Sequence, residues 1–372
     1  MKKVIIFILI FVLIFGFNVS AQTETQDFLK EQAQLIGANE LEQALPDDTQ
    51  NFFEKIGITP ENGEWVNDFG IKKVFTLLLE LVKKELSAPF NCGLLIIAII
   101  LVNGVFFVTE NGNSAKTANL AVTAACAAVI TAPLLSVINT AVTVLQSVAD
   151  FMTVFVPVFA SVIALNGKAV TSVSMSSLLL GASQTVELVA NHFVIPLMCG
   201  YLCISVVSGV SPLLAGNYLG DAVKKVSFWV MSLMTTVFIG ILSIQTAVNA
   251  SADSLATKTA KFIIGSSVPL AGTVLSEALT TVTASLGILK TSVAVYGVVA
   301  CSVIFLPVLI NLLLWRITLN LTGFIADALG SNISKLLRSI DTTVAVLCGI
   351  ILLSGAMFII SLTVVVSAGK TV

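Results

Sequence analysis

Charged residues are scarce in this chain, and they become scarcer along it. Only 11% of the 372 residues are Asp, Glu, Lys or Arg, whereas soluble domains carry about 25%. After residue 91 the chain has repeated apolar runs of about 18 residues or more, each long enough to cross a hydrocarbon core of roughly 30 Å. No soluble core could absorb that much apolar surface. The sequence therefore predicts an all-α polytopic membrane protein.

Histidine is almost absent, and so are the usual catalytic motifs. The single histidine, His192, excludes a metal site built from several histidines. The sequence also lacks an HExxH zinc motif, a GxxxxGK[ST] phosphate loop and a DxDxDG calcium loop. Ser183 and His192 lie nine residues apart on one expected helix, which is a poor arrangement for an intramembrane serine protease. We expect no enzyme, cofactor, metal or nucleic-acid partner.

The first 21 residues have the pattern of a targeting segment. Lys2 and Lys3 form a positive start, Val4 to Phe17 form a short apolar stretch, and Ala21 ends the segment with a small residue. This pattern predicts a signal peptide over residues 1–21 that is cleaved after Ala21, with an uncleaved anchor as the alternative. In both cases the chain that follows begins outside the cytoplasm.

Residues 22–90 predict an acidic, helical, extracytoplasmic region. They hold thirteen of the twenty-one acidic side chains, against six lysines, and no cysteine from which a disulfide could form. Thr59 and Pro60 resemble a helix start, and apolar residues from Trp65 to Val82 recur at helical spacing. We expect an amphipathic helix that enters the bilayer. It serves either as an anchor among lipid headgroups or as a docking face for another extracytoplasmic protein.

Residues 91–372 predict a multi-span domain of about eight transmembrane helices. If the amino end lies outside, seven basic residues between the spans are cytoplasmic and three are external, in agreement with the positive-inside rule. Residues 178–212 are long for one upright span and contain Pro196, so a kinked or broken helix is expected. The spans are placed at 92–109, 118–138, 142–165, 178–212, 226–250, 262–287, 292–315 and 344–367.

Three dipeptides hint that the domain repeats itself. Val156-Pro157 matches Val268-Pro269, Ile195-Pro196 matches Leu306-Pro307, and Leu219-Gly220 matches Leu329-Gly330, at offsets of 112, 111 and 110. The repeats would be residues 151–250 and 263–362. With three spans each, the second would be inverted relative to the first, as in many transporters. Chance is the alternative, because such pairs are common in apolar sequence.

A few polar and small residues inside the apolar runs are candidate functional positions. Glu187 and Glu277 are costly in a membrane, and Gln184 and His192 could line one polar seam with Glu187. The seam is either a proton or ion path or a set of helix–helix hydrogen bonds. Gly209 and Gly349 lie in small-residue patterns that predict close helix packing, within the protein or with a partner.

One segment carries a family resemblance. Between Ser243 and Lys290, polar and charged residues follow a fixed order between apolar runs, and Phe151-Met152 with Val156-Pro157 forms an earlier landmark. The pattern resembles the signature of the stage III sporulation protein AE family of endospore-forming bacteria, over essentially the whole chain. The signature positions are Gln245, Asp253, Lys258, Lys261, Gly265 and Pro269.

The resemblance implies a role in the mother-cell membrane that faces the engulfed forespore. It implies other stage III sporulation membrane proteins as partners, including a ring-forming protein and, indirectly, a secretion-type ATPase. It supplies no catalytic residues. Three functions stay distinct: a subunit of a channel or export platform, an ion- or proton-coupled transporter of a small solute, and a scaffold for partner assembly. We favour the first, with lipid and either these partners or further copies of the chain around it.

Overall fold

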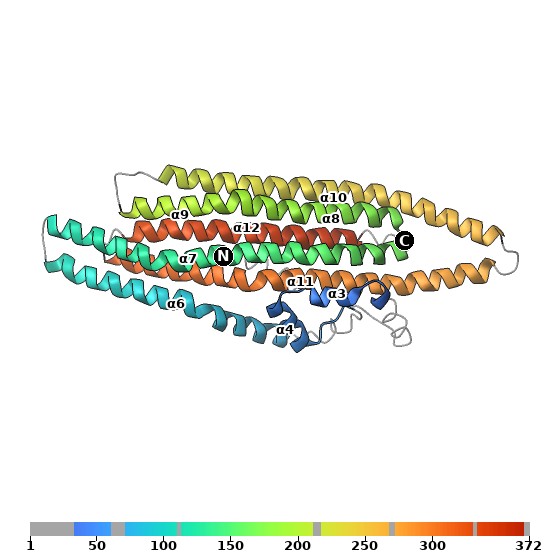
Figure 1. The fold of residues 1–372 in the computed structure, drawn as a ribbon, viewed down its shortest axis with the longest axis horizontal. Helices are drawn as coiled ribbons and strands as arrows, with labels where there is room; N and C mark the ends of the chain where they lie inside the picture. The colour runs from blue at the N-terminus through green and yellow to red at the C-terminus, as the bar shows by residue number, and fades with distance from the viewer. Residues whose placement is uncertain are drawn as a thin grey trace.

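The computed structural model describes residues 33–60, 71–109, 113–210, 217–267, 272–329 and 333–367. The regular structure in these ranges is entirely helical, as expected, and Figure 1 shows an elongated bundle of long helices lying side by side. The predicted signal peptide lies outside the described residues. The helices are α3 Ala38–Gln43, α4 Asp47–Ile56, α6 Ile71–Thr109, α7 Asn113–Leu165, α8 Ala169–Val189, η2 Ala190–Val194, α9 Ile195–Val210, α10 Asn217–Ser267, α11 Gly272–Ala328 and α12 Ile333–Ser367.

Six helical segments of the described chain are long and apolar enough to cross a membrane, so the expected count of eight spans is not confirmed. No break occurs between the predicted spans 118–138 and 142–165, because α7 continues through them for 53 residues, about 80 Å. Polar residues at this point satisfy their hydrogen bonds inside the helix: Thr140 donates to the Ser136 carbonyl and Thr143 to that of Asn139. They therefore do not end it.

The predicted break at residues 288–291 is absent for the same reason. Helix α11 runs through these positions, and Thr291 donates to the carbonyl of Gly287 one turn earlier. The start of α10, with Leu219, and the end of α11, beside Leu329, lie at the same end of the bundle (Figure 1). An inverted repeat requires these positions on opposite sides. The repeat is therefore not confirmed.

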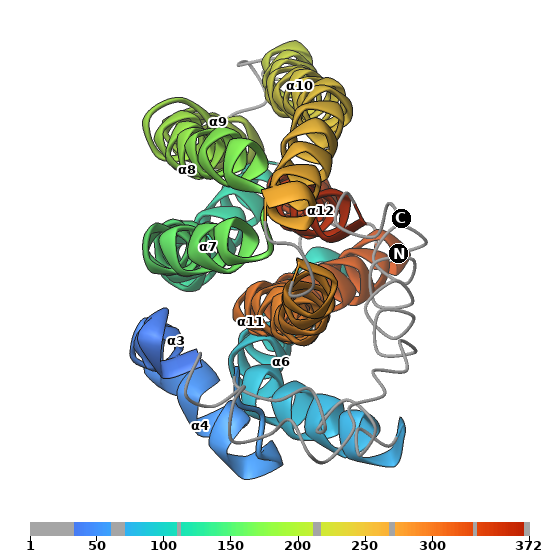
Figure 2. The ribbon, with the colours of Figure 1, turned by 90° about the vertical axis from the view of Figure 1, so that its right-hand side faces the viewer.

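Helix α11 occupies the centre of the bundle. It packs against α6, α7 and α12, as the end-on view in Figure 2 shows. The most apolar 18 residues within its stretch Leu289–Ala328 are 89% buried by protein, as expected of a segment that is hydrophobic all round, whereas Leu321 and Phe324 near the end of the stretch are exposed. Gly297 provides one close approach, because a Cβ atom there would lie 2.4 Å from the ring of Phe155 on α7.

Helix α10 lies at the periphery. Its outer face exposes large apolar side chains over 23 positions, about 34 Å of helix, which matches the thickness of a hydrocarbon core. Lipid is the natural solvent for this face. The exposed residues are Val226, Trp229, Leu233, Val237, Ile241, Ile244 and Val248.

The predicted span 178–212 contains a short π-helix, and the kink or break expected there stays a prediction. Between α8 and α9, residues Ala190–Val194 adopt π geometry, and the Ile195 N–H donates to the carbonyl of Ala190, five residues earlier. Pro196 follows directly. Because proline has no N–H and its ring clashes with the carbonyl four residues before it, the widened turn lets the helix continue.

The short helices α3 and α4 lie against the bundle rather than apart from it. Helix α3 contacts α7, and α4 contacts α11. Phe53 of α4 is buried and meets the ring of Tyr296 edge-on at 5.2 Å, while Asp48 pairs at the surface with Lys84 of α6 at 3.3 Å. The described part of the acidic amino region is thus helical, with an apolar side on the bundle and a charged side outward.

Candidate functional site

The clearest polar site lies where α7 turns into α8. The turn uses Gly167 at φ 75°, a conformation that glycine adopts without strain. Asn166 donates a hydrogen bond to the carbonyl of Val162 at 2.8 Å, which closes the end of α7. Lys168 holds the N-cap position of α8 and makes no side-chain cap. The first N–H groups of α8 therefore need an acceptor from elsewhere.

Asp253 of α10 supplies that acceptor. Its two carboxylate oxygens accept from the backbone N–H groups of Val170 and Thr171, each at 3.1 Å, and from the Thr171 hydroxyl at 2.5 Å. A carboxylate at a helix N-terminus is also favoured by the helix dipole. Asp253 is 3% exposed, and its contacts give the buried charge the partners that it requires. This signature residue caps another helix.

Two further residues of α10 share its face with Asp253. Gln245 donates to the hydroxyl of Ser174 on α8 at 2.7 Å. Asn249 is buried, and its Nδ2 atom has no hydrogen-bond partner among the described residues. Since 245, 249 and 253 are spaced by four residues, they line one side of α10. Two signature positions thus join α10 to α8.

Two lysines complete the site. Lys290 of α11 is 6% exposed, and it is close enough to Lys168 for their charges to repel. Burial lowers the pKa of Lys168, and the negative charge of Asp253 opposes that shift. We call Asn166, Lys168, Thr171, Asn249, Asp253 and Lys290 the cap cluster. It gathers side chains from the α7–α8 turn, α8, α10 and α11.

The chemistry of the cap cluster is that of binding and helix joining. Within the described ranges no three His, Cys, Asp or Glu side chains come together as a metal site would require. The cluster's one carboxylate is engaged as a cap. Lys258, Lys261 and Gly265 follow on α10 where it extends past the cluster, but their side chains lie outside the described part, and Pro269 lies outside the described residues altogether.

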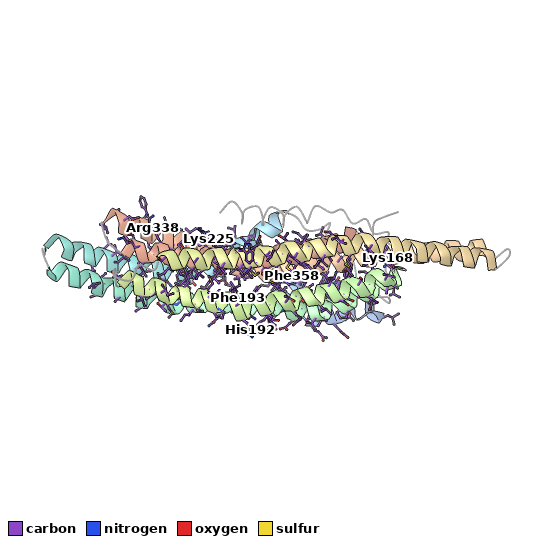
Figure 3. All side chains as sticks on the ribbon, turned by 90° about the horizontal axis from the view of Figure 1, so that it is seen from above. Lys168, His192, Phe193, Lys225, Arg338 and Phe358 are labelled. Atoms are coloured by element: carbon purple, nitrogen blue, oxygen red, sulfur yellow. The ribbon has the colours of Figure 1, made fainter. Side chains whose placement is uncertain are left out.

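The proposed polar seam of α8 is not a single group of contacts. Gln184 and His192 are exposed, and Figure 3 shows His192 at the edge of the molecule. Glu187 is half-buried and accepts from Asn191 at 3.4 Å, whereas the His192 Nδ1 lies 3.2 Å from the Leu188 carbonyl. Each contact stays within one helix. Glu277 lies on α11, with its side chain outside the described part.

One of the two predicted packing glycines has a visible partner. A Cβ atom at Gly349 of α12 would lie 2.2 Å from the Phe228 ring of α10, so these helices approach closely there. The surroundings of Gly209 on α9 lie outside the described side chains.

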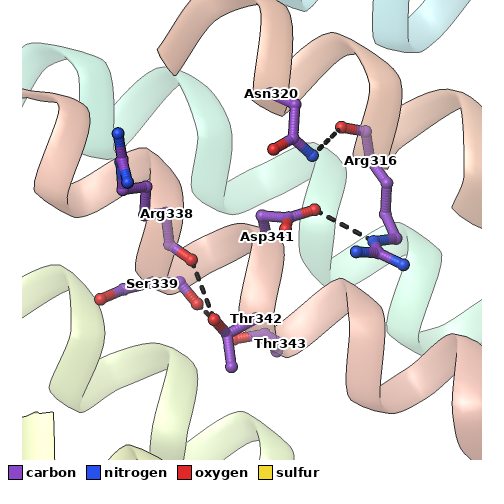
Figure 4. A network of polar contacts seen from close by, with 7 residues as sticks. All are labelled: Arg316, Asn320, Arg338, Ser339, Asp341, Thr342 and Thr343. Atoms are coloured by element: carbon purple, nitrogen blue, oxygen red, sulfur yellow. Dashed lines mark hydrogen bonds and ion pairs between the residues drawn. The ribbon is translucent and has the colours of Figure 1, made fainter. Parts of the chain in front are cut away.

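Sequence reasoning missed a second polar group, at the other end of α11 and α12. Arg316 donates to Asp341 at 3.1 Å, and Asn320 donates to the Arg316 carbonyl (Figure 4). Arg338 pairs nearby with Asp327. The sequence does show opposite charges on both sides of Gly330, where α11 ends and α12 follows. It does not show which acidic residue pairs with which arginine.

Comparisons with known proteins agree on one family. The family model described as stage III sporulation protein AE matches residues 59–369. The stage III sporulation protein AE of Bacillus subtilis (strain 168) is 27% identical over 234 residues, which cover 63% of this chain and 59% of that relative's length. No solved structure matches. With the multi-span helical bundle described above, the profile match shows that this chain belongs to the stage III sporulation protein AE family.

Proposed function

We propose that the protein is an integral membrane subunit of a sporulation-specific channel or secretion-like complex between mother cell and forespore. It acts there as an export platform or part of the conduit. The observation that carries the proposal is family membership combined with a closely packed bundle whose peripheral helices expose apolar faces. Partners are other stage III sporulation membrane proteins, including a ring-forming protein and, indirectly, a secretion-type ATPase.

The placement of the acidic side chains supports a platform over a self-contained coupled transporter. An ion-coupled carrier places ionisable groups in the bundle interior or in a water-filled cavity. Glu187 instead sits half-buried at the periphery and contacts its own helix. The buried Asp253 is occupied as a helix cap. The Asp253 contacts hold α10 and α8 together.

The orientation remains part of the proposal, with the amino-terminal region outside the cytoplasm in the membrane around the forespore. With six passes instead of eight, several basic residues lie on the opposite side of the membrane. The excess of cytoplasmic over external basic residues then falls from seven against three to six against four. The six are Lys116, Lys224, Lys225, Arg316, Lys335 and Arg338, and the four are Lys168, Lys258, Lys261 and Lys290.

Affinity purification from sporulating cells tests the platform role. The tagged full chain should retain the ring-forming protein and the other membrane products of its operon, and this retention should survive Glu187→Gln. In parallel, the purified chain in liposomes should move no solute along a proton gradient. Solute uptake that Glu187→Gln abolishes and Asp150→Asn, an exposed acid on α7, leaves intact would overturn the platform in favour of the transporter.

A scaffold role is the second candidate, favoured by the close contact of Gly349 with Phe228. A scaffold needs rigid helix packing but no passage through the complex. It predicts that partner retention fails when Gly349 is enlarged, and that chemical blocking of any conduit residue has no effect on sporulation.

A further inference from the structure

The amino-terminal helices α3 and α4 cover one side of the bundle. Figure 2 shows them beside α7, α11 and α6, and α3 contacts α7 while α4 contacts α11. Apolar side chains make this contact. Leu41 of α3 is 0% exposed, and Phe53 of α4 is 3% exposed with its ring edge-on to that of Tyr296 on α11. The two helices therefore form one cover over α7 and α11.

The face of α11 at this contact carries two hydroxyl groups that lack partners. Ser292 and Tyr296 lie one turn apart on the same side of the helix and are 2% and 0% exposed. Neither hydroxyl has a hydrogen-bond partner among the described residues. A buried polar group without a partner is costly and calls for an explanation. Water would satisfy both hydroxyls if the cover lifted, so the closed state carries a penalty that an open state would not.

This face of α11 begins at a polar end of the bundle. Tyr296 lies six residues after Lys290 of the cap cluster, about 9 Å along the helix. At the level of Lys290 the α7–α8 turn meets the solvent, since Gly167 is exposed and Lys168 is half-exposed. Water therefore needs to advance only about two helical turns to reach Ser292 and Tyr296.

The cover can leave the bundle without losing its own structure. The side chain of Gln50 donates to the Leu45 carbonyl at 2.9 Å, which ties α4 to the turn before it. The ion pair between Asp48 and Lys84 of α6 joins the cover to the bundle, but both side chains are exposed, and an exposed pair contributes little. Apolar packing therefore holds the cover closed, and the two unpaired hydroxyls oppose it.

Glycines at both ends of the cover allow it to move. Gly37 precedes α3 at φ 77° and Gly57 ends α4 at φ 78°. Glycine changes between positive and negative φ at little cost, and hinges are a few such residues at element ends. We propose that α3 and α4 form a hinged cover, which lifts from α7 and α11 while the bundle stays folded and so controls access to the Ser292–Tyr296 face of α11.

Thiol labelling of the purified full chain in detergent tests the cover. In a background without native cysteines, Ser292→Cys places a thiol on the covered face. Ser354→Cys places one at an equally buried hydroxyl of α12, which has no described partner either. The thiol at 292 should react with a small maleimide about tenfold faster or more than the thiol at 354, because local opening needs less free energy than global unfolding. Phe53→Ala should raise the rate at 292 by a further factor of about ten or more and leave the rate at 354 unchanged.

Leu35→Ala is the matched control, because Leu35 belongs to the same amino-terminal region but is 74% exposed, and it should change neither rate. Equal rates at 292 and 354 without Phe53→Ala would overturn the cover, since α3 and α4 would then be a fixed part of the core. Equal acceleration of both thiols by Phe53→Ala would overturn it too, because the variant would then act by unfolding the bundle. Leu41→Ala gives the same readout if Phe53→Ala does not fold. Neither rate depends on the platform role, which partner retention tests separately.

Discussion

At the scale of single residues, Asp253 joins two helices that lie far apart in sequence. It reaches the backbone of α8 across 83 and 82 positions of the chain. We predict that Asp253→Ala lowers the free energy of unfolding by about 1–2 kcal/mol, the usual cost of losing an N-cap. Asp253→Asn should lose less, because its amide oxygen still accepts. Thermal unfolding in detergent measures both.

Asp150→Ala is the control for this prediction, since Asp150 is an exposed acid on α7. Its removal should leave stability within about 0.5 kcal/mol. If Asp253→Ala and Asp150→Ala unfold at the same midpoint, the cap contributes nothing and its contacts are incidental.

Gly349 is a residue that a neighbouring side chain requires to be small. We predict that Gly349→Ala destabilises by about 1–3 kcal/mol, the range for overpacking, because the new methyl group would overlap the Phe228 ring. Adding Phe228→Leu should recover part of the loss. A double-mutant cycle on unfolding midpoints measures the coupling.

Gly181 of α8 is the matched control, because nothing lies within 4 Å of a Cβ atom there. Gly181→Ala should be neutral or stabilising by up to about 1 kcal/mol, from the higher helix propensity of alanine. Additive effects of Gly349→Ala and Phe228→Leu would contradict the proposed contact.

At the scale of elements, α10 is the helix whose environment is easiest to test. Val237 lies midway along its exposed apolar face. We predict that Val237→Lys costs about 2.5–3.5 kcal/mol of insertion free energy, so that less protein stays in membranes after alkaline extraction. Leu35→Lys, at a 74% exposed position of the amino region, is the control and should extract like wild type. Equal retention of both would mean that this face does not meet lipid.

The elements also show where sequence patterns mislead. The spans predicted from the sequence leave gaps at 139–141 and 288–291, where Thr140 and Thr291 lie, and Thr143 follows just after the first gap. Each of them bonds to a carbonyl one turn earlier on its own helix, which costs the helix little. Composition alone cannot separate a threonine that ends a helix from one that continues it.

At the scale of the whole molecule, the number of passes decides which loops share a side. Six passes place Lys225 and Lys335 at one end of the bundle and Lys168 at the other. Eight passes would put Lys168 with Lys335 and Lys225 across the membrane. We predict that single cysteines at 225 and 335, in a background without native cysteines, react alike with a membrane-impermeant thiol reagent.

A cysteine at 168 should show the opposite accessibility in the same assay. Intact protoplasts and inverted vesicles give the two sides, and a permeant reagent controls for burial. If 168 and 335 react together and 225 differs, the eight-pass arrangement is correct and α7 does not cross as one helix.

Much of this architecture was open to prediction from the sequence. The scarcity of charge predicted a helical membrane protein, because a backbone in lipid must satisfy its own hydrogen bonds. The signature between Ser243 and Lys290 indicated the family that the profile match shows. Gln245 and Asp253 were singled out, but only as positions in a pattern. Their contacts with Ser174 and Thr171 depend on the folded arrangement.

The sequence by itself determined that the chain is a helical membrane protein and which family it belongs to, because these follow from its composition and from the order of residues along short segments. Tertiary structure decided which helix lies at the centre, which end of α8 Asp253 caps, and how Lys168 and Lys290 come together. The physical reason is distance along the chain. Local rules act over a few residues, whereas these contacts join positions 82 to 122 residues apart, and only packing selects them.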